Sequence, residues 1–151
     1  MQEQSNSPGR LDHQLGPFFS ELSRFNSPAA LQASDLYARL EPEITRVLKT
    51  VVQEDFAPDV STSRSSIRAA AWNIERGTHL EGVIRVLKEH PLLQDSDILL
   101  LTELDLGMAR SHNRLIAQEV AQALKLNYAF APCYIALNKG SGLESEVPGE
   151  N

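Results

Sequence analysis

Cysteine is nearly absent from this 151-residue chain, and Cys133 stands alone. A single cysteine excludes both an intrachain disulfide and a cysteine-based zinc cluster. Long apolar runs are also missing, because the longest one, residues 98–101, is far shorter than the ~20 residues of a membrane-spanning helix. The first ten residues are polar and lack the apolar segment of a secretory signal. These absences favour a soluble, cytoplasmic protein.

Basic residues are scarcer than acidic ones, 14 against 20, and the net charge is −6. This balance argues against a generic nucleic-acid coat protein, whose affinity comes from an excess of Lys and Arg. Residues 64–140 alone are close to neutral, so a local basic patch remains open there. Hydrophobic residues make up 42% of the chain, which argues for a folded core and against wholesale disorder.

The N-terminal third has helical periodicity. Apolar residues from Leu15 to Leu22 fall on one helical face, and Ser27-Pro28 is typical of an N-cap followed by proline at the first helical position. Pro42 is predicted to break or restart the helix. We therefore expect a disordered tail over residues 1–10, a helical extension over residues 11–56 and a polar linker over residues 57–66.

The pattern changes after the linker. Apolar runs at residues 67–72, 98–101 and 127–136 predict three strands, separated by two amphipathic segments that predict helices. Residues 67–136 therefore predict the order β-α-β-α-β. This order is typical of an α/β layered fold, in which helices cover the faces of a central sheet.

Capping signals place the ends of these two helices. Thr78 and Glu81 have the spacing of a capping box at the start of the first helix, and His90-Pro91 is expected to end it. Ser111 is expected to cap the second helix.

Two polar residues follow the first two predicted strands. The carboxyl ends of parallel strands in a β-α-β unit lie at the same edge of the sheet, so Asn73 is expected near Glu103. A carboxylate beside an amide oxygen suits Mg²⁺, which takes one or two protein carboxylates together with water and substrate phosphate. The alternative interpretation is a turn-forming Asn and a solvated Glu.

Residues 72–77 (WNIERG) followed by residues 100–105 (LLTELD) resemble the opening half of the endonuclease/exonuclease/phosphatase superfamily, which has the deoxyribonuclease-I-like fold. The resemblance covers about residues 66–140. It implies that Glu103 is the main Mg²⁺ ligand, with Mn²⁺ as a possible substitute, and that Asn73 belongs to the same metal and phosphate site. Catalytic roles for Asn73 and Glu103 follow from the same resemblance.

The family's downstream motifs, including the closing Asp-His pair that supplies its catalytic His, are not found in the sequence. We therefore expect residues 67–151 to be the N-terminal half of such a domain, a partial deoxyribonuclease-I-like α/β sandwich. A sheet edge would then be unpaired and apolar surface exposed.

The implied function is Mg²⁺-dependent hydrolysis of a phosphodiester or phosphomonoester, with nucleic acid or a phospholipid headgroup as substrate. The fragment by itself is expected to be inactive. A non-catalytic fragment or interaction module that keeps the scaffold is the alternative.

Other polar residues lie close to the main pair in the sequence. Arg110, Asn113 and Arg114 cluster after Glu103, where they suit phosphate binding or, alternatively, a salt bridge that orders the loop. Glu75 and Asp105 are expected either to orient ligands or to be exposed.

The remaining candidates have ordinary structural explanations. None of the four histidines, His13, His79, His90 and His112, matches the family's catalytic His. Cys133 lies in a strand-like apolar stretch and is expected to be a small buried hydrophobic residue.

Overall fold

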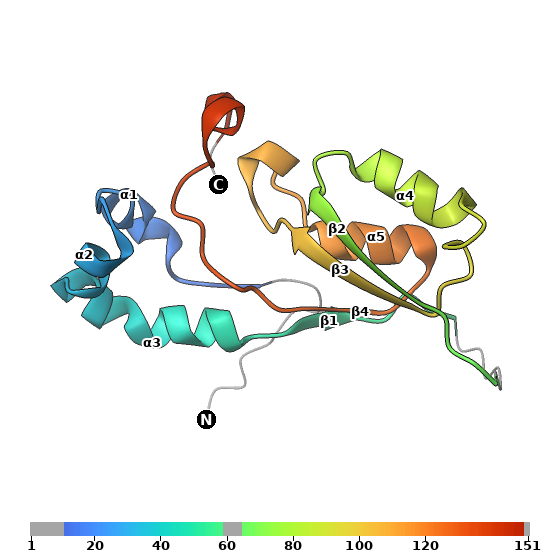
Figure 1. Cartoon of the computed structure of the whole chain (residues 1–151). Helices are drawn as coiled ribbons and strands as arrows, with labels where there is room; N and C mark the ends of the chain where they lie inside the picture. Colours follow the sequence, from blue (N-terminus) through green and yellow to red (C-terminus); the bar gives the residue numbers. More distant parts are fainter. Residues whose placement is uncertain (1–10, 59–64, 150–151) are drawn as a thin grey trace. The chain divides into compact units, whose positions relative to one another are not determined.

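The computed structural model describes residues 11–58 and 65–149, which form a mixed α/β structure. Its helices are α1 (Phe19–Leu22), α2 (Pro28–Gln32), α3 (Asp35–Lys49), α4 (Leu80–Glu89) and α5 (Ile116–Leu124) (Figure 1). Its strands are β1 (Val52–Glu54), β2 (Ala69–Arg76), β3 (Ile98–Leu104) and β4 (Tyr128–Phe130). In the described part of the chain, no helix is long and apolar enough to cross a membrane. The expected tail, residues 1–10, and most of the expected linker lie outside the described residues.

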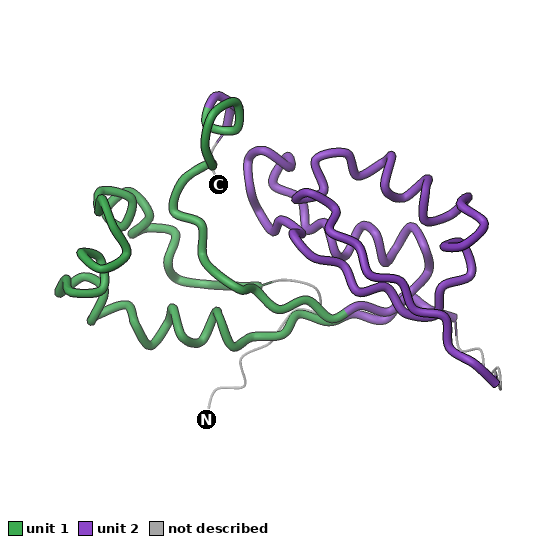
Figure 2. Tube along the Cα trace, viewed as in Figure 1, with its two compact units in different colours: residues 1–53, 129–145 green, residues 54–128, 146–151 purple. Residues whose placement is uncertain are grey.

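The chain forms two compact units, each assembled from separate segments (Figure 2). Within the described residues, unit 1 consists of residues 11–53 with 129–145. Unit 2 consists of residues 54–58 and 65–128 with 146–149.

The strands form two small sheets, in which β1 pairs with β4 and β2 pairs with β3. The prediction of one sheet containing all three strands of the β-α-β-α-β pattern is therefore wrong. β1 begins three residues after the end of α3 and offers β4 an alternative partner. The helical periodicity of the N-terminal third conceals this short strand. The strand predicted over residues 127–136 is also shorter, since β4 ends at Phe130.

An apolar cluster drawn from both segments forms the core of unit 1. Its buried members are Leu15, Leu22, Leu40 and Val47. Ile135 and Leu137, from the second segment, pack against this cluster. The apolar face predicted from Leu15 to Leu22 is thus confirmed, and its partners include residues more than a hundred positions away.

The helix signals of unit 1 are partly confirmed. Ser27 Oγ accepts a hydrogen bond from the N–H of Ala30 at 3.2 Å, which is the predicted cap of α2. Pro42 lies inside α3, so the prediction that it breaks the helix is wrong. Proline removes one backbone donor, but Leu40 and Val47 are buried on either side of it, and their packing holds the helix together.

A charged network ties the start of unit 1 to α3. Arg46 Nε donates to Glu43 Oε2 at 2.7 Å, and Glu43 Oε1 accepts a hydrogen bond from the N–H of Gln14 at 2.8 Å. Arg46 Nη2 also donates to the carbonyl oxygen of Asp12 at 2.7 Å. The hydrogen bonds that Glu43 accepts from Arg46 and Gln14 lower its pKa to about 2, and the bonding to Arg46 has the larger effect of the two.

We expect Glu43 to stabilise unit 1 only while it is ionised. Its pKa lies below the ordinary value of 4.5, so its contribution is fully present above pH 4.5 and is lost as the pH falls towards 2. The substitution Glu43→Gln is expected to lower the unfolding free energy by about 1 kcal/mol near neutral pH, because the pair is partly exposed. Urea unfolding followed by far-UV circular dichroism at several pH values measures this difference.

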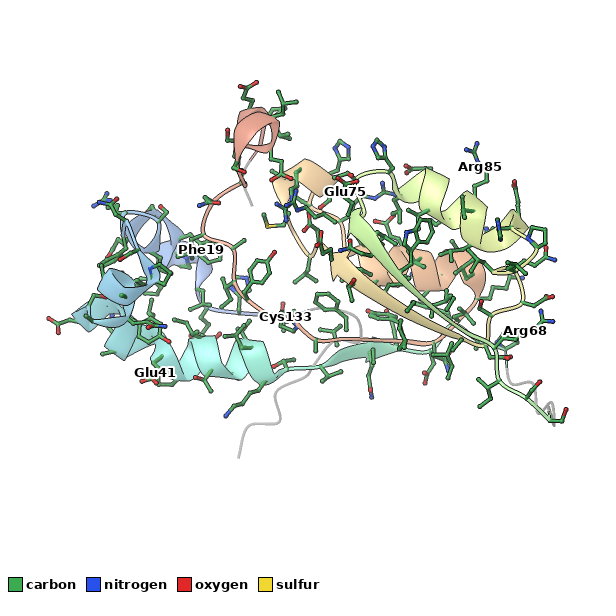
Figure 3. All side chains as sticks on the ribbon, in the orientation of Figure 1. Phe19, Glu41, Arg68, Glu75, Arg85 and Cys133 are labelled. Atoms are coloured by element: carbon green, nitrogen blue, oxygen red, sulfur yellow. The ribbon has the colours of Figure 1, made fainter. Side chains whose placement is uncertain are left out.

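Glu41→Gln is the matched control, since Glu41 is an exposed acid on the same helix (Figure 3). It is expected to change the unfolding free energy by less than about 0.5 kcal/mol. A difference between Glu43→Gln and wild type that does not shrink as the pH falls would contradict the expectation.

Unit 2 contains a parallel β-α-β motif made of β2, α4 and β3. The register pairs Ala69 with Ile98 and continues in step to Asn73 with Thr102. It then shifts, because the next pair joins Arg76 to Leu104. The sheet of unit 2 therefore has a bulge at the carboxyl end of β2.

Helices α4 and α5 pack on one face of this sheet. The buried cluster consists of Ile74, Leu80, Val83, Leu87, Ile116 and Val120. The helical faces predicted for these two segments are thus confirmed. Ile98 and Leu100 of β3 remain 43% and 60% exposed, which confirms the expectation of exposed apolar surface.

Both predicted helix caps of unit 2 are wrong. Thr78 Oγ1 donates to the carbonyl oxygen of Glu75, and α4 begins without a side-chain cap, so no capping box with Glu81 forms. Ser111 Oγ donates to the carbonyl oxygen of Met108 within the 3-10 helix η2 (Ala109–Ser111), and α5 also begins without a side-chain cap. The predicted end of α4 at His90-Pro91 is confirmed.

Candidate functional site

The parallel pairing of β2 and β3 brings the two main candidates together. Asn73 Nδ2 donates a hydrogen bond to Glu103 Oε1 at 2.8 Å. Asn73 of β2 pairs with Thr102 of β3 in the register, and Glu103 is the next residue of β3. Both side chains are exposed. The predicted proximity of Asn73 and Glu103 is therefore confirmed, and the reason is the shared direction of the two strands.

The amide of Asn73 is held at both of its ends. Its Oδ1 accepts a hydrogen bond from the N–H of Glu75 at 3.0 Å, while its Nδ2 binds the carboxylate. Among residues 11–58 and 65–149, no group donates a hydrogen bond to Oε2 of Glu103. The exposed carboxylate is thus oriented through one oxygen, Oε1.

Left-handed backbone conformations gather around this pair. The φ angles of Glu75, Arg76 and Glu103 are 48°, 67° and 55°, and Gly77 follows at 74°. For a residue with a Cβ, this region costs roughly 1–2 kcal/mol. Strained residues of this kind concentrate at functional sites. Figure 3 shows Glu75 at the end of β2, next to the turn that follows.

Asp105 is buried close to this edge of the sheet. Its two carboxylate oxygens accept hydrogen bonds from Arg110 Nε and Nη2, each at 2.8 Å, and both side chains are 7% exposed. Its backbone N–H donates to the carbonyl oxygen of Arg76 at 3.4 Å, and its own carbonyl accepts from the N–H of Ile116 at 3.2 Å. Asp105, which directly follows β3, therefore contacts the last residue of β2, the η2 segment and α5.

The other phosphate-binding candidates also make intrachain contacts. Arg114 Nε donates to Glu119 at 2.8 Å and Nη1 donates to Glu81 at 3.0 Å. These two carboxylates, Glu119 before Glu81, raise the pKa of Arg114. Asn113 Nδ2 donates to the carbonyl oxygen of Gly107 at 2.9 Å. The contacts match the alternative of a loop ordered by salt bridges, and the phosphate-binding role stays a prediction.

Histidine and cysteine do not contribute to this cluster. Within the described residues, no group of three or more His, Cys, Asp or Glu side chains could hold a metal ion. His79 and His90 flank α4, and His112 follows η2, all of them exposed. Cys133 is exposed as well, so the prediction that it is buried is wrong (Figure 3). It lies beyond the end of β4, where the alternation of a strand no longer applies.

Comparisons of the chain with models of protein families, with curated proteins and with solved structures found no match in any of the three. The functional interpretation of the site therefore depends on the residues themselves.

Sequence reasoning missed two features of the site. The first is the pairing of Asp105 with Arg110, for which the only signal is an acid and a base in the otherwise apolar stretch of residues 104–110. The second is the left-handed conformation of Glu103, for which the sequence carries no signal, since glycine is the residue that normally marks such positions.

Proposed function

We propose that this chain carries the metal site of a Mg²⁺-dependent phosphoesterase that resembles the endonuclease/exonuclease/phosphatase superfamily, with its deoxyribonuclease-I-like fold. The observation that carries the proposal is the hydrogen bond between Asn73 and Glu103 at the carboxyl edge of two parallel strands. Ligands of open α/β sheets bind outside this edge. The left-handed residues around the pair support the same location.

The donor set fits Mg²⁺. This ion prefers oxygen ligands, keeps several of its waters, and is commonly held by one or two carboxylates plus substrate phosphate. Glu103 would hold it through the oxygen that Asn73 does not bind, and Asn73 would keep that carboxylate in place. When bound, the ion supplies a Lewis acid that polarises a phosphoryl oxygen. Mn²⁺ has similar ligand preferences and is a suitable probe.

The proposed substrates are phosphate esters, either nucleic acid or a phospholipid headgroup. The site edge carries two acidic side chains, Glu75 and Glu103, beside one basic side chain, Arg76. The two carboxylates repel a phosphate unless a cation lies between them and the phosphate. This charge pattern supports hydrolysis that depends on a divalent cation over binding by basic side chains alone.

Hydrolysis of bis(nitrophenyl) phosphate, a diester, and nitrophenyl phosphate, a monoester, tests the proposal in the presence of Mg²⁺ or Mn²⁺. Since the chain by itself is expected to be inactive, Mn²⁺ binding is the decisive readout. Any hydrolysis that is detected is expected to fall by roughly 100-fold or more in Glu103→Gln, because a Lewis acid contributes several kcal/mol to the transition state. Glu89→Gln, at an exposed acid at the end of α4, is the matched control and is expected to leave the rate unchanged. Equal, measurable rates in wild type and Glu103→Gln, or equal Mn²⁺ affinities, would refute the assignment of Glu103.

An interaction module is the second candidate, and the exposed apolar side chains of β3 favour it. Ile98 and Leu100 present apolar surface that a partner could cover. Binding of Mn²⁺, measured by electron paramagnetic resonance, separates the two candidates. A wild-type chain that neither hydrolyses the esters nor binds Mn²⁺ would contradict the phosphoesterase proposal and support the interaction module.

A further inference from the structure

Glu103 lies opposite the bulge in β2. Between the pairs Asn73–Thr102 and Arg76–Leu104, β2 contains one residue more than β3. Glu103 spans this mismatch with a left-handed φ of 55°. A residue other than glycine keeps such a conformation only where the surrounding structure imposes it. The strands must therefore be held together beyond the bulge for Glu103 to stay beside Asn73.

The backbone hydrogen bond that Asp105 makes beyond the bulge is long. The N–H of Asp105 reaches the carbonyl oxygen of Arg76 at 3.4 Å, longer than the usual range for a strong hydrogen bond. The side chain of Asp105 makes a much stronger contact, because two charge-assisted bonds of 2.8 Å join it to Arg110. Both partners are nearly buried, so water does not compete with these bonds.

We propose that the Asp105–Arg110 ion pair is a positioning clamp that keeps the Glu103 carboxylate in hydrogen-bond reach of Asn73. Asp105 lies two residues after Glu103, and the pair fixes the chain at that point against η2. Groups behind a ligand commonly set its orientation in this way. The inference rests on the proposed function only where it concerns metal affinity, because the Asn73–Glu103 contact exists in the chain itself.

Arg110→Lys in the full chain tests the clamp, because lysine keeps the charge and loses the bidentate geometry. The first readout is the NMR signal of the Asn73 side-chain amide, with Glu103→Ala as the reference for a broken bond. Arg110→Lys is expected to move this signal towards its position in Glu103→Ala. The second readout is Mn²⁺ affinity, which is expected to fall by about tenfold.

Val120→Ala is the matched control, since it weakens the core at α5 without touching the ion pair. It is expected to lower the melting temperature while leaving the Asn73 signal and the Mn²⁺ affinity unchanged. The same result for Arg110→Lys would overturn the clamp and leave the pair a purely structural contact. If Arg110→Lys fails to fold, Asp105→Asn takes its place, because asparagine has the same shape and is expected to shift the signal in the same direction.

The two readouts distinguish failure of the clamp from failure of the proposed function. A wild-type chain that binds no Mn²⁺ contradicts the metal site, and the Asn73 signal then decides the clamp by itself. Mn²⁺ binding that disappears in Glu103→Ala but is unchanged in Arg110→Lys, with an unmoved Asn73 signal, supports the metal site and refutes the clamp.

Discussion

Replacing Gly77 by alanine is expected to lower the unfolding free energy of unit 2 by about 3 kcal/mol. Gly77 has a φ of 74°, and a Cβ at this position would lie 2.6 Å from Cγ2 of Ile116. The left-handed conformation contributes roughly 1 kcal/mol to the loss, and overpacking against a fully buried side chain contributes about 1–3 kcal/mol. Trp72, the single tryptophan of the chain, lies in β2 and reports urea unfolding of this unit by fluorescence.

The double variant Gly77→Ala/Ile116→Ala separates the two causes. Ile116→Ala alone is expected to cost about 2–5 kcal/mol through the cavity it leaves. In its background Gly77→Ala should cost only about 1 kcal/mol, because the clashing atoms are gone and strain remains. Additive losses in the double variant would show that the contact with Ile116 does not matter.

Gly82→Ala is the matched control for this experiment. Gly82 lies inside α4, and nothing lies within 4 Å of the Cβ that alanine would add. The same substitution is therefore expected to stabilise unit 2 by about 0.5–1 kcal/mol, the usual helix preference of alanine over glycine.

Removing one partner of the buried Asp105–Arg110 ion pair is also expected to have a large effect on the stability of unit 2. Asp105→Ala is expected to lower the unfolding free energy by about 3–5 kcal/mol, because it removes the carboxylate that binds a nearly buried guanidinium through two charge-assisted bonds. The loss exceeds what the ion pair itself contributes, since most of it is the desolvation of the remaining charge. Urea unfolding followed by Trp72 fluorescence measures it.

Two further variants serve as references for Asp105→Ala. Replacing both partners, as Asp105→Leu/Arg110→Met, is expected to restore most of the stability, because no buried charge remains. Arg68→Gln breaks the exposed pair between Arg68 and Asp95 and is expected to change stability by less than about 1 kcal/mol. A loss in Asp105→Ala as small as that in Arg68→Gln would show that the buried pair is accessible to water.

The part of the site that depends on strand ends could be predicted from the sequence. Each apolar run stops at a polar residue, and the handedness of a β-α-β unit then places Asn73 beside Glu103. Helix faces such as Leu80, Val83 and Leu87 were equally predictable, because burial repeats with the helical period.

The remaining features depend on contacts that no local pattern encodes. β4 was expected in the same sheet as β2 and β3, but β1 takes it as a partner, and three-residue strands leave almost no periodicity to detect. Thr78 was expected to cap a helix, and instead binds the carbonyl oxygen of Glu75 in a left-handed turn. The partner of β4 comes from a distant segment, whereas Thr78 binds a carbonyl oxygen only three residues before it in the turn.

Unit 1 is built from two segments that are far apart in the sequence, and this arrangement affects the order of folding. Its two segments flank unit 2 in the sequence, so they meet only after a long loop has closed, at an entropic cost. Contacts within unit 2 close that loop. Gln118 Nε2 donates a hydrogen bond to Glu54 Oε2 at 2.7 Å. Asn127 Oδ1 accepts hydrogen bonds from the N–H groups of Phe56 and Ala57. The helices of unit 1 are synthesised first, yet their core includes Ile135 and Leu137, so we expect that core to be completed only after residues 129–145 have been made.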